Sequence, residues 1–231
     1  MTKSAFTLAE VLITLGIIGI VASLTIPTLM AKNQKNEAYT ALQKALSVIS
    51  SATAQMREDN GGSMADIATD ASGFADALKP YLHVIKSCTD TSDCYLESTD
   101  TIKALTGQTF ARSTEMISEY PKIVTSDGFV FIMGQVFSQC DAIFYKQNGE
   151  NQYCTNLYVD TNGKKKPNTV GKDLFSISIN KYNTTPYLDM HGSFTTPESS
   201  IAAMCNMSSP GEWAGAVCAY KAIMDGGIKY Y

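Results

Sequence analysis

The segment that most constrains this chain is an uncharged apolar run near its N-terminus. Residues Val11–Ala31 contain no charged side chain. As a helix, these twenty-one residues would extend about 32 Å at about 1.5 Å per residue, close to the thickness of a bilayer's hydrocarbon core. We therefore predict that the run can span a membrane. Lys3, the only basic side chain before it, favours a cytoplasmic N-terminus, with the rest of the chain outside.

A single carboxylate, Glu10, stands at the start of this run. A carboxylate in surroundings of low dielectric costs free energy unless it is paired, and acids within membrane segments commonly mark function. A secretory signal peptide cleaved near Val21-Ala22-Ser23 and a plain uncleaved anchor are two alternatives, but neither explains Glu10. A third alternative is that Glu10 only extends its charged end to the membrane interface.

The residues around Glu10 resemble a known processing site. Ala5-Phe6-Thr7-Leu8-Ala9-Glu10-Val11 resembles the cleavage site of type IV prepilins and type II secretion pseudopilins. The resemblance implies that a prepilin peptidase cuts between Ala5 and Phe6, that Phe6 becomes N-methylated, and that residues 1–5 are a leader. The family usually has Gly before the cut, where this chain has Ala5. Glu10 occupies the family's acidic position, and we expect it to pair with the new Phe6 amine of a neighbouring subunit in a filament.

Helical spacing continues beyond the apolar run, so we expect one helix from Thr7 to Glu58, stopped by Asn60-Gly61-Gly62. Residues 6–31 form its membrane and assembly half, and residues 32–58 form an amphipathic stalk. The stalk's apolar positions recur at intervals of three, four and seven, namely Ala38, Leu42, Ala45, Leu46, Ile49 and Met56. Pro27 removes one helical hydrogen bond and predicts a break or kink near it. The pilin resemblance implies that the helix loosens there in filaments.

Residues 59–231 read as one globular head outside the cytoplasm. We expect a helix at Ser72–Tyr81 and another at Ala214–Met224, the second ended by Asp225-Gly226-Gly227. Runs of aromatic and β-branched residues predict strands at Ile123–Thr125, Phe129–Met133, Ala142–Tyr145, Leu157–Val159 and Leu174–Ile179. Asp127-Gly128 predicts a hairpin turn between the first two of these strands. The predicted fold class is α+β, a pilin-like long N-terminal helix packed on an antiparallel sheet.

All six cysteines lie in this head: Cys88, Cys94, Cys140, Cys154, Cys205 and Cys218. Six cysteines allow about fifteen pairings. Their grouping favours sequential bridges, Cys88 to Cys94, Cys140 to Cys154 and Cys205 to Cys218. Disulfides are the expected fate of cysteines outside the cytoplasm. A zinc site is the alternative, but the head has no CxxC pair and only two histidines, His83 and His191.

The stretch from Asp160 to Asp173 carries oxygen-bearing side chains around two glycines. Calcium prefers such ligands, although the EF-hand spacing is absent. The stretch resembles the calcium-binding loop of the major pseudopilin of type II secretion, and the resemblance makes Asp160, Asn162, Asn168 and Asp173 candidate ligands. The alternative is that these residues form turns without an ion. Three consecutive lysines, Lys164–Lys166, weaken the calcium prediction. No other cofactor is expected.

The sequence does not favour catalysis or general nucleic-acid binding. No GxSxG, HExxH or P-loop pattern accompanies the histidines, and the formal net charge is −4. Trp213 lies between Cys205 and Cys218, where we expect its ring to pack under their loop rather than to anchor a ligand. The chain is thus expected to be a substrate of enzymes and a structural part, not an enzyme.

The resemblance implies a subunit of a type IV pilus or type II secretion pseudopilus. The expected partners are prepilin peptidase, copies of itself or other pilins, an inner-membrane assembly platform and membrane lipid. Before assembly the chain would cross the bacterial inner membrane once, with its N-terminus cytoplasmic, and afterwards it would lie in a periplasmic or surface filament. The alternative is a membrane-anchored binding protein or adhesin that never polymerises. Glu10 separates the two, because a simple anchor does not need it.

Overall fold

The computed structural model describes residues 7–89, 94–142, 146–147, 150–188, 197–208 and 211–231. The chain divides into two compact units, Met1–Glu37 and Ala38–Tyr231. One helix, α1 (Leu8–Asp59), contributes to both. The predicted cleavage residues, Ala5 and Phe6, lie outside the described residues.

Helix α1 confirms the prediction of one long N-terminal helix, within one residue at each end. Its C-terminus is closed by two glycines with positive φ, Gly61 at 71° and Gly62 at 90°. The Gly62 N–H donates to the carbonyl of Arg57 over 2.8 Å, which satisfies a carbonyl of the last turn. The structure shows no break at Pro27, because α1 runs through this residue without interruption; a kink at Pro27 stays a prediction. One missing N–H removes a single bond from the helical ladder, and the turns on either side keep theirs.

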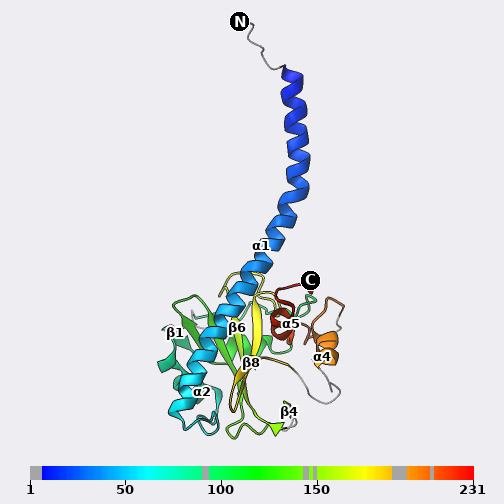
Figure 1. The fold of residues 1–231 in the computed structure, drawn as a ribbon. Coiled ribbons are helices and arrows are strands. Elements are labelled where there is room, and N and C mark those ends of the chain that lie inside the picture. The colour runs from blue at the N-terminus through cyan, green and yellow to red at the C-terminus, as the bar shows by residue number, and fades with distance from the viewer. Residues whose placement is uncertain (1–6, 90–93, 143–145, 148–149, 189–196, 209–210) are drawn as a thin grey trace. The chain divides into compact units, whose positions relative to one another are not determined.

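In the second unit, α1 lies across one face of a six-stranded sheet (Figure 1). The side chains of its buried stripe are Leu42, Ala45, Ile49, Ala52, Thr53 and Met56. Every strand pair is antiparallel, in the spatial order β1-β2-β3-β6-β7-β8. The strands are β1 (Val84–Cys88), β2 (Lys122–Thr125), β3 (Val130–Val136), β6 (Tyr153–Asp160), β7 (Leu174–Asn180) and β8 (Thr184–Pro186). The α+β class with an antiparallel sheet is confirmed.

Four of the predicted strands correspond to β2, β3, β6 and β7. The predicted turn at Asp127-Gly128 joins β2 to β3, where the Gly128 N–H donates to the Thr125 carbonyl over 2.9 Å. Of the predicted strand at Ala142–Tyr145, Ala142 lies outside any strand and the other three residues lie outside the described part. The edge strands β1 and β8 were not predicted, and neither was the small sheet of β4 (Lys146–Gln147) and β5 (Glu150–Asn151).

Short helices flank the sheet. Helix α2 (Ala71–Leu78) begins where the Asp70 carboxylate accepts from the Gly73 N–H over 2.8 Å, and a 3-10 turn, η1 (Lys79–Tyr81), follows it. Helix α5 (Cys218–Asp225) starts later than predicted, because residues 214–217 form turns, and it ends at left-handed Gly226 as expected. Two further helices were not predicted, α3 (Ser113–Ser118) and α4 (Pro197–Met204).

The two faces of the sheet differ in chemistry. Thr184 of β8 lies opposite Ile179 of β7, and its hydroxyl is 2.7 Å from that of Thr53 on α1. The face of Ile179 therefore looks toward α1, and its buried apolar side chains include Phe175 and Ile177. On the opposite face, the paired strands β6 and β7 present polar and aromatic side chains, Asn156, Tyr158, Ser176 and Ser178.

The structure joins the six cysteines in the sequential pairs predicted from their grouping: Cys88–Cys94, Cys140–Cys154 and Cys205–Cys218. The first ties the end of β1 to the loop after it, and the second ties the segment after β3 to β6. The third ties the chain after α4 to the start of α5. Each bridge closes a connection of the head onto a strand or helix.

Candidate functional site

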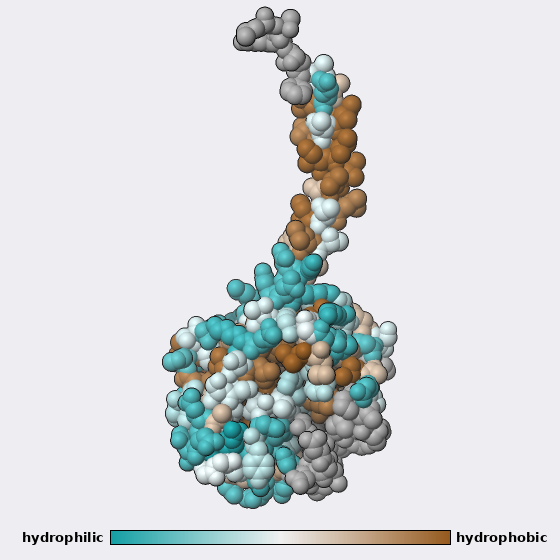
Figure 2. All heavy atoms as spheres, viewed as in Figure 1, coloured by the Kyte–Doolittle hydropathy of each residue, from teal (hydrophilic) through white to brown (hydrophobic). Residues whose placement is uncertain are grey.

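The apolar half of α1 does not pack against any other described part of the chain. Its bulky apolar side chains are exposed, for example Leu12, Ile18 and Leu24. Figure 2 shows hydrophobic residues along the visible face of this part of the helix. By length and composition, α1 is the one described helix that could cross a membrane. Exposed apolar surface on this scale marks contact with lipid or with other protein.

Glu10 and Thr7 form a reciprocal cap at the start of α1. The Thr7 N–H and hydroxyl both donate to Oε2 of Glu10 over 2.8 Å, and the Glu10 N–H approaches the Thr7 hydroxyl oxygen at 3.2 Å. This is the capping-box arrangement, in which Glu or Gln three residues after Ser or Thr closes the first helical turn. The Thr7-x-x-Glu10 spacing is visible in the sequence, but it was not predicted to form a cap; Glu10 was expected to act in assembly or, alternatively, to extend to the membrane interface. Within one chain, Glu10 therefore has a local role as well.

The second candidate site is the loop between β6 and β7, built around Asp160 and Asp173. Asp160, at the end of β6, is fully buried. Its Oδ1 accepts from the Asn162 N–H (3.0 Å) and the Gly163 N–H (2.7 Å), and its Oδ2 accepts from the Tyr95 hydroxyl over 2.7 Å. These bonds show that the carboxylate organises the turn that follows the strand.

Asp173 closes the same loop from its other end. Its Oδ2 accepts from the Asn168 N–H over 2.8 Å and from the Asn162 side-chain amide over 3.2 Å. Its Oδ1 accepts from the Thr169 N–H over 2.7 Å. Asn162 thus contacts Asp160 through its backbone N–H and Asp173 through its side-chain amide, and Asn168 contacts Asp173 through its backbone N–H. The four residues predicted as calcium ligands therefore meet in one loop.

The electrostatics of this loop favour a bound cation. Burial, and next the neighbouring Asp173 carboxylate, raise the pKa of Asp160 to about 8, and burial also raises the pKa of Asp173. The side-chain oxygens of Asn162 and Asn168 are buried and accept no hydrogen bond in the described structure. Two acids and two amide oxygens suit calcium, which takes about six to eight oxygen ligands.

Two observations limit this fit. The described residues hold no group of three or more His, Cys, Asp or Glu that could bind a metal ion, so a calcium shell would need amide and backbone oxygens. Both carboxylates also already accept hydrogen bonds from the loop, as expected for turns without an ion. Lys164–Lys166 are exposed. The residues fit calcium by donor type, and calcium binding stays a prediction.

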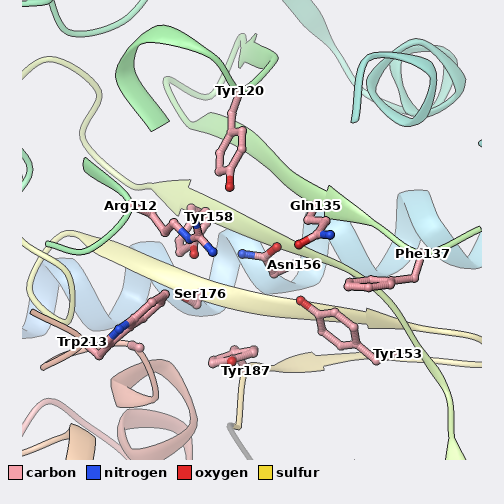
Figure 3. Close-up of a pocket in the computed structure, with 11 residues that line it drawn as sticks. Arg112, Tyr120, Gln135, Phe137, Tyr153, Asn156, Tyr158, Ser176, Tyr187 and Trp213 are labelled. Carbon is pink, nitrogen blue, oxygen red and sulfur yellow. The ribbon is translucent and has the colours of Figure 1, made fainter. Parts of the chain in front are cut away.

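A third candidate site is a small pocket of about 50 Å³ on the sheet face opposite α1 (Figure 3). Its lining residues come from several segments: Arg112, Tyr120, Gln135, Phe137, Tyr153, Asn156, Tyr158, Ser176, Tyr187, Trp213 and Ala216. Figure 3 shows the Asn156 amide near the centre, with aromatic side chains around it and α1 behind the sheet. No local pattern in the sequence predicts this site, because its residues are spread over about a hundred positions and no motif links them.

Trp213 takes part in this pocket, contrary to the expectation that it packs under its own disulfide loop. Its side chain is 40% exposed and lines the pocket. Its ring meets that of Phe110 edge to face, with centroids 5.6 Å apart, and the Arg112 guanidinium lies 5.8 Å from its centroid. The ring is thus held from one side by residues remote in sequence.

Of the two histidines, His191 lies outside the described residues.

No family model, curated protein or solved structure matches this chain. The pilin resemblance therefore rests on the N-terminal motif and its spacing.

Proposed function

We propose that this protein is a subunit of a type IV pilus or type II secretion pseudopilus. A prepilin peptidase would remove residues 1–5, and the chain would enter a helical filament through the apolar half of α1. Before assembly that half would lie in the bacterial inner membrane. The head would lie on the far side of this membrane, where its three disulfides are chemically favoured.

The observation that carries the proposal is a bare apolar helix with one carboxylate at its first turn. Bulky apolar side chains are exposed from Leu8 to Met30, and Glu10 is the only ionisable group between Thr7 and Ala31. A simple anchor buries such a helix in lipid and has no need of an acid in it. A filament needs both features, because stacked helices cover each other's apolar sides and a buried acid requires a positive partner.

The Thr7–Glu10 cap supplies an alternative reason for the acid, and the two reasons can be separated. Gln closes a capping box as Glu does, but it carries no charge. Thr7→Ala removes the capping hydroxyl and keeps the carboxylate. We expect Glu10→Gln to reach the membrane at the wild-type level and to be lost from sheared filaments. Thr7→Ala should be incorporated nearly as well as wild type.

The test is to express wild type, Glu10→Gln and Thr7→Ala in bacterial cells that carry a prepilin peptidase and an assembly platform. The amounts of each variant in membranes and in sheared filaments are compared by immunoblot. Equal incorporation of Glu10→Gln and wild type would refute the charge-pairing role. Loss of Thr7→Ala alone would show that Glu10 acts through the cap.

A calcium ion in the head is a further part of the proposal. Asp160, Asn162, Asn168 and Asp173 would hold it, with backbone carbonyls. When bound, the ion would supply positive charge between two buried acids. The residues themselves would fix the connection between β6 and β7.

An anchored adhesin that never polymerises is the second candidate. The pocket on the sheet face opposite α1, here called the outer face, favours an adhesin. A purely structural head does not require a concave site with exposed Trp213. The two functions are compatible, because a filament subunit can also carry a binding site.

A further inference from the structure

The pocket on the outer face of the sheet combines aromatic walls with a polar floor. From its lining, we propose that it binds a sugar residue of an oligosaccharide. The proposal does not depend on whether the chain polymerises, since every lining residue belongs to the unit Ala38–Tyr231. The pocket is small, about 50 Å³, so it would receive one edge of a single sugar ring and leave the rest of the oligosaccharide outside.

The aromatic walls suit the two faces of a sugar ring. A pyranose presents C–H bonds on its faces, and their slightly positive hydrogens are attracted to the negative face of an aromatic ring. Trp213 offers an exposed indole that is already fixed by Phe110 and Arg112. In Figure 3, Tyr153 and Tyr187 lie on the other side of the Asn156 amide from Tyr120. A ring above Asn156 would therefore lie among aromatic side chains from several elements.

The polar floor suits the hydroxyl groups at the edge of a sugar. The side chains of Asn156 and Gln135 each carry a donor and an acceptor, as a hydroxyl does. Ser176 is only 2% exposed, and its buried Oγ has no hydrogen-bond partner in the described structure. A buried hydroxyl without a partner costs free energy. A ligand hydroxyl in the pocket would supply that partner, directly or through a water molecule.

Gly134 makes the position of Asn156 possible. These residues lie on neighbouring strands, and a Cβ built at Gly134 would come within 2.1 Å of the Asn156 Oδ1. The Asn156 amide therefore lies over the bare backbone of β3. A side chain at position 134 would displace it. The amide at the pocket's centre is thus placed by the sheet itself, which gives the floor a fixed geometry.

The charge of the lining argues against other classes of small ligand. Among the described lining residues there is no Asp or Glu, so this lining offers a metal ion or an amine no anionic partner. Arg112 is the one Lys or Arg among the lining residues that the structure describes, and its guanidinium pairs with Glu115 over 2.8 Å. Much of its charge is therefore already balanced, so an anion would gain little. A neutral ligand rich in hydroxyl groups fits best.

The experiment uses the full chain in lauryldimethylamine oxide, a detergent without a sugar headgroup. The protein is first applied to a printed array of oligosaccharides, and each bound saccharide is then titrated in solution. Trp213 is the only tryptophan in the chain, so its fluorescence reports directly on the pocket. We expect at least one saccharide to bind and to change this fluorescence with saturation.

Substitutions of residues in and near the pocket then test whether the saccharide binds there. Asn156→Ala and Gln135→Ala should each weaken it by about tenfold, the effect of losing one well-formed hydrogen bond. Gly134→Ala should also weaken it, by displacing Asn156. Tyr182→Ala, which removes an exposed ring outside the lining, should bind like wild type. Thermal melting confirms that each variant is folded.

Two results would overturn the proposal. One is that no saccharide on the array binds wild type above the detergent blank. The other is a saccharide that binds folded Asn156→Ala and Gln135→Ala as tightly as wild type, since its site would then lie elsewhere. Because the side chain of Gln135 is exposed, Gln135→Ala is expected to fold, and it keeps the test decisive even if Asn156→Ala does not fold.

Discussion

Tyr95 and Asp160 are joined by a buried hydrogen bond of 2.7 Å across 65 residues of sequence. The tyrosine hydroxyl donates to the carboxylate that ends β6 and opens the loop of the candidate calcium site. Both side chains are fully buried. The bond thus connects the segment after the Cys88–Cys94 bridge to the loop between β6 and β7. Stability of this loop is expected to depend on a residue far from it in sequence.

Removing the donor tests this link. Tyr95→Phe keeps the ring and leaves Oδ2 of Asp160 without its side-chain donor. Because a buried acceptor without a partner carries a desolvation cost, we expect the free energy of unfolding to fall by about 1–3 kcal/mol. Chemical denaturation of wild type and of Tyr95→Phe, both in chelator, measures this change in the free energy of unfolding. Tyr182→Phe, on the surface, is the control. A Tyr95→Phe protein as stable as wild type would contradict the role of the bond.

Calcium should raise the melting temperature of the protein. An ion bound only by the folded state stabilises it by RT ln(1 + [ion]/Kd). We expect a higher midpoint in millimolar calcium than in chelator, and no difference for Asp173→Asn. Asp76→Asn, which removes an exposed acid, should respond like wild type. If the melting midpoint of wild type is the same in calcium and in chelator, the loop does not bind calcium.

The pKa of Asp160 predicts a pH dependence in chelator. Its folded-state pKa is about 8, against 3.8 for the ordinary carboxyl group. The folded state therefore binds the proton more tightly, and unfolding releases it at intermediate pH. This contribution to stability is fully present below pH 3.8, falls as the pH rises, and is lost above pH 8. Asp160→Asn has no such proton. Denaturation from pH 5 to pH 9 should therefore show a steeper decline in wild type than in the variant, and parallel curves would contradict the shift.

The disulfides should each contribute to the stability of the head. A bridge that closes a loop of 13 residues, as Cys205–Cys218 does, restricts the unfolded chain and typically contributes about 2–4 kcal/mol. We expect the double variant Cys205→Ala with Cys218→Ala to lose about this much free energy of unfolding. Intact mass should also rise by six hydrogens on full reduction, two for each of the three bridges. A smaller rise would show that one bridge is absent.

Local patterns in the sequence predicted the elements that depend on local physics. The end of α1 follows from Gly61 and Gly62, whose positive φ angles other residues rarely adopt. The central strands follow from runs of buried aromatic and β-branched residues, such as those of β7. The edge strands lack that signal. Three of the five side chains of β1 are exposed, and β8 has only three residues.

Contacts between segments that are distant in sequence had no comparable signal in the sequence. The gathering of Asp160 and Asp173 was predicted because one loop contains both, whereas the contact of Tyr95 with Asp160 depends on the packing of distant segments. The pocket depends on the register between β6 and β7, which pairs Tyr158 with Ser176. The Thr7–Glu10 cap is different, since its spacing was visible in the sequence and its meaning was overlooked.

The most direct measurement of the central claim is the mass of the N-terminal peptide of the protein recovered from sheared filaments. We expect a peptide that begins at Phe6 and carries one methyl group on its amine. That result requires cleavage after Ala5 and assembly of the processed chain. A protein that begins at Met1, stays in the membrane and is missing from the filament fraction would contradict the proposal that this chain is a pilin-like subunit.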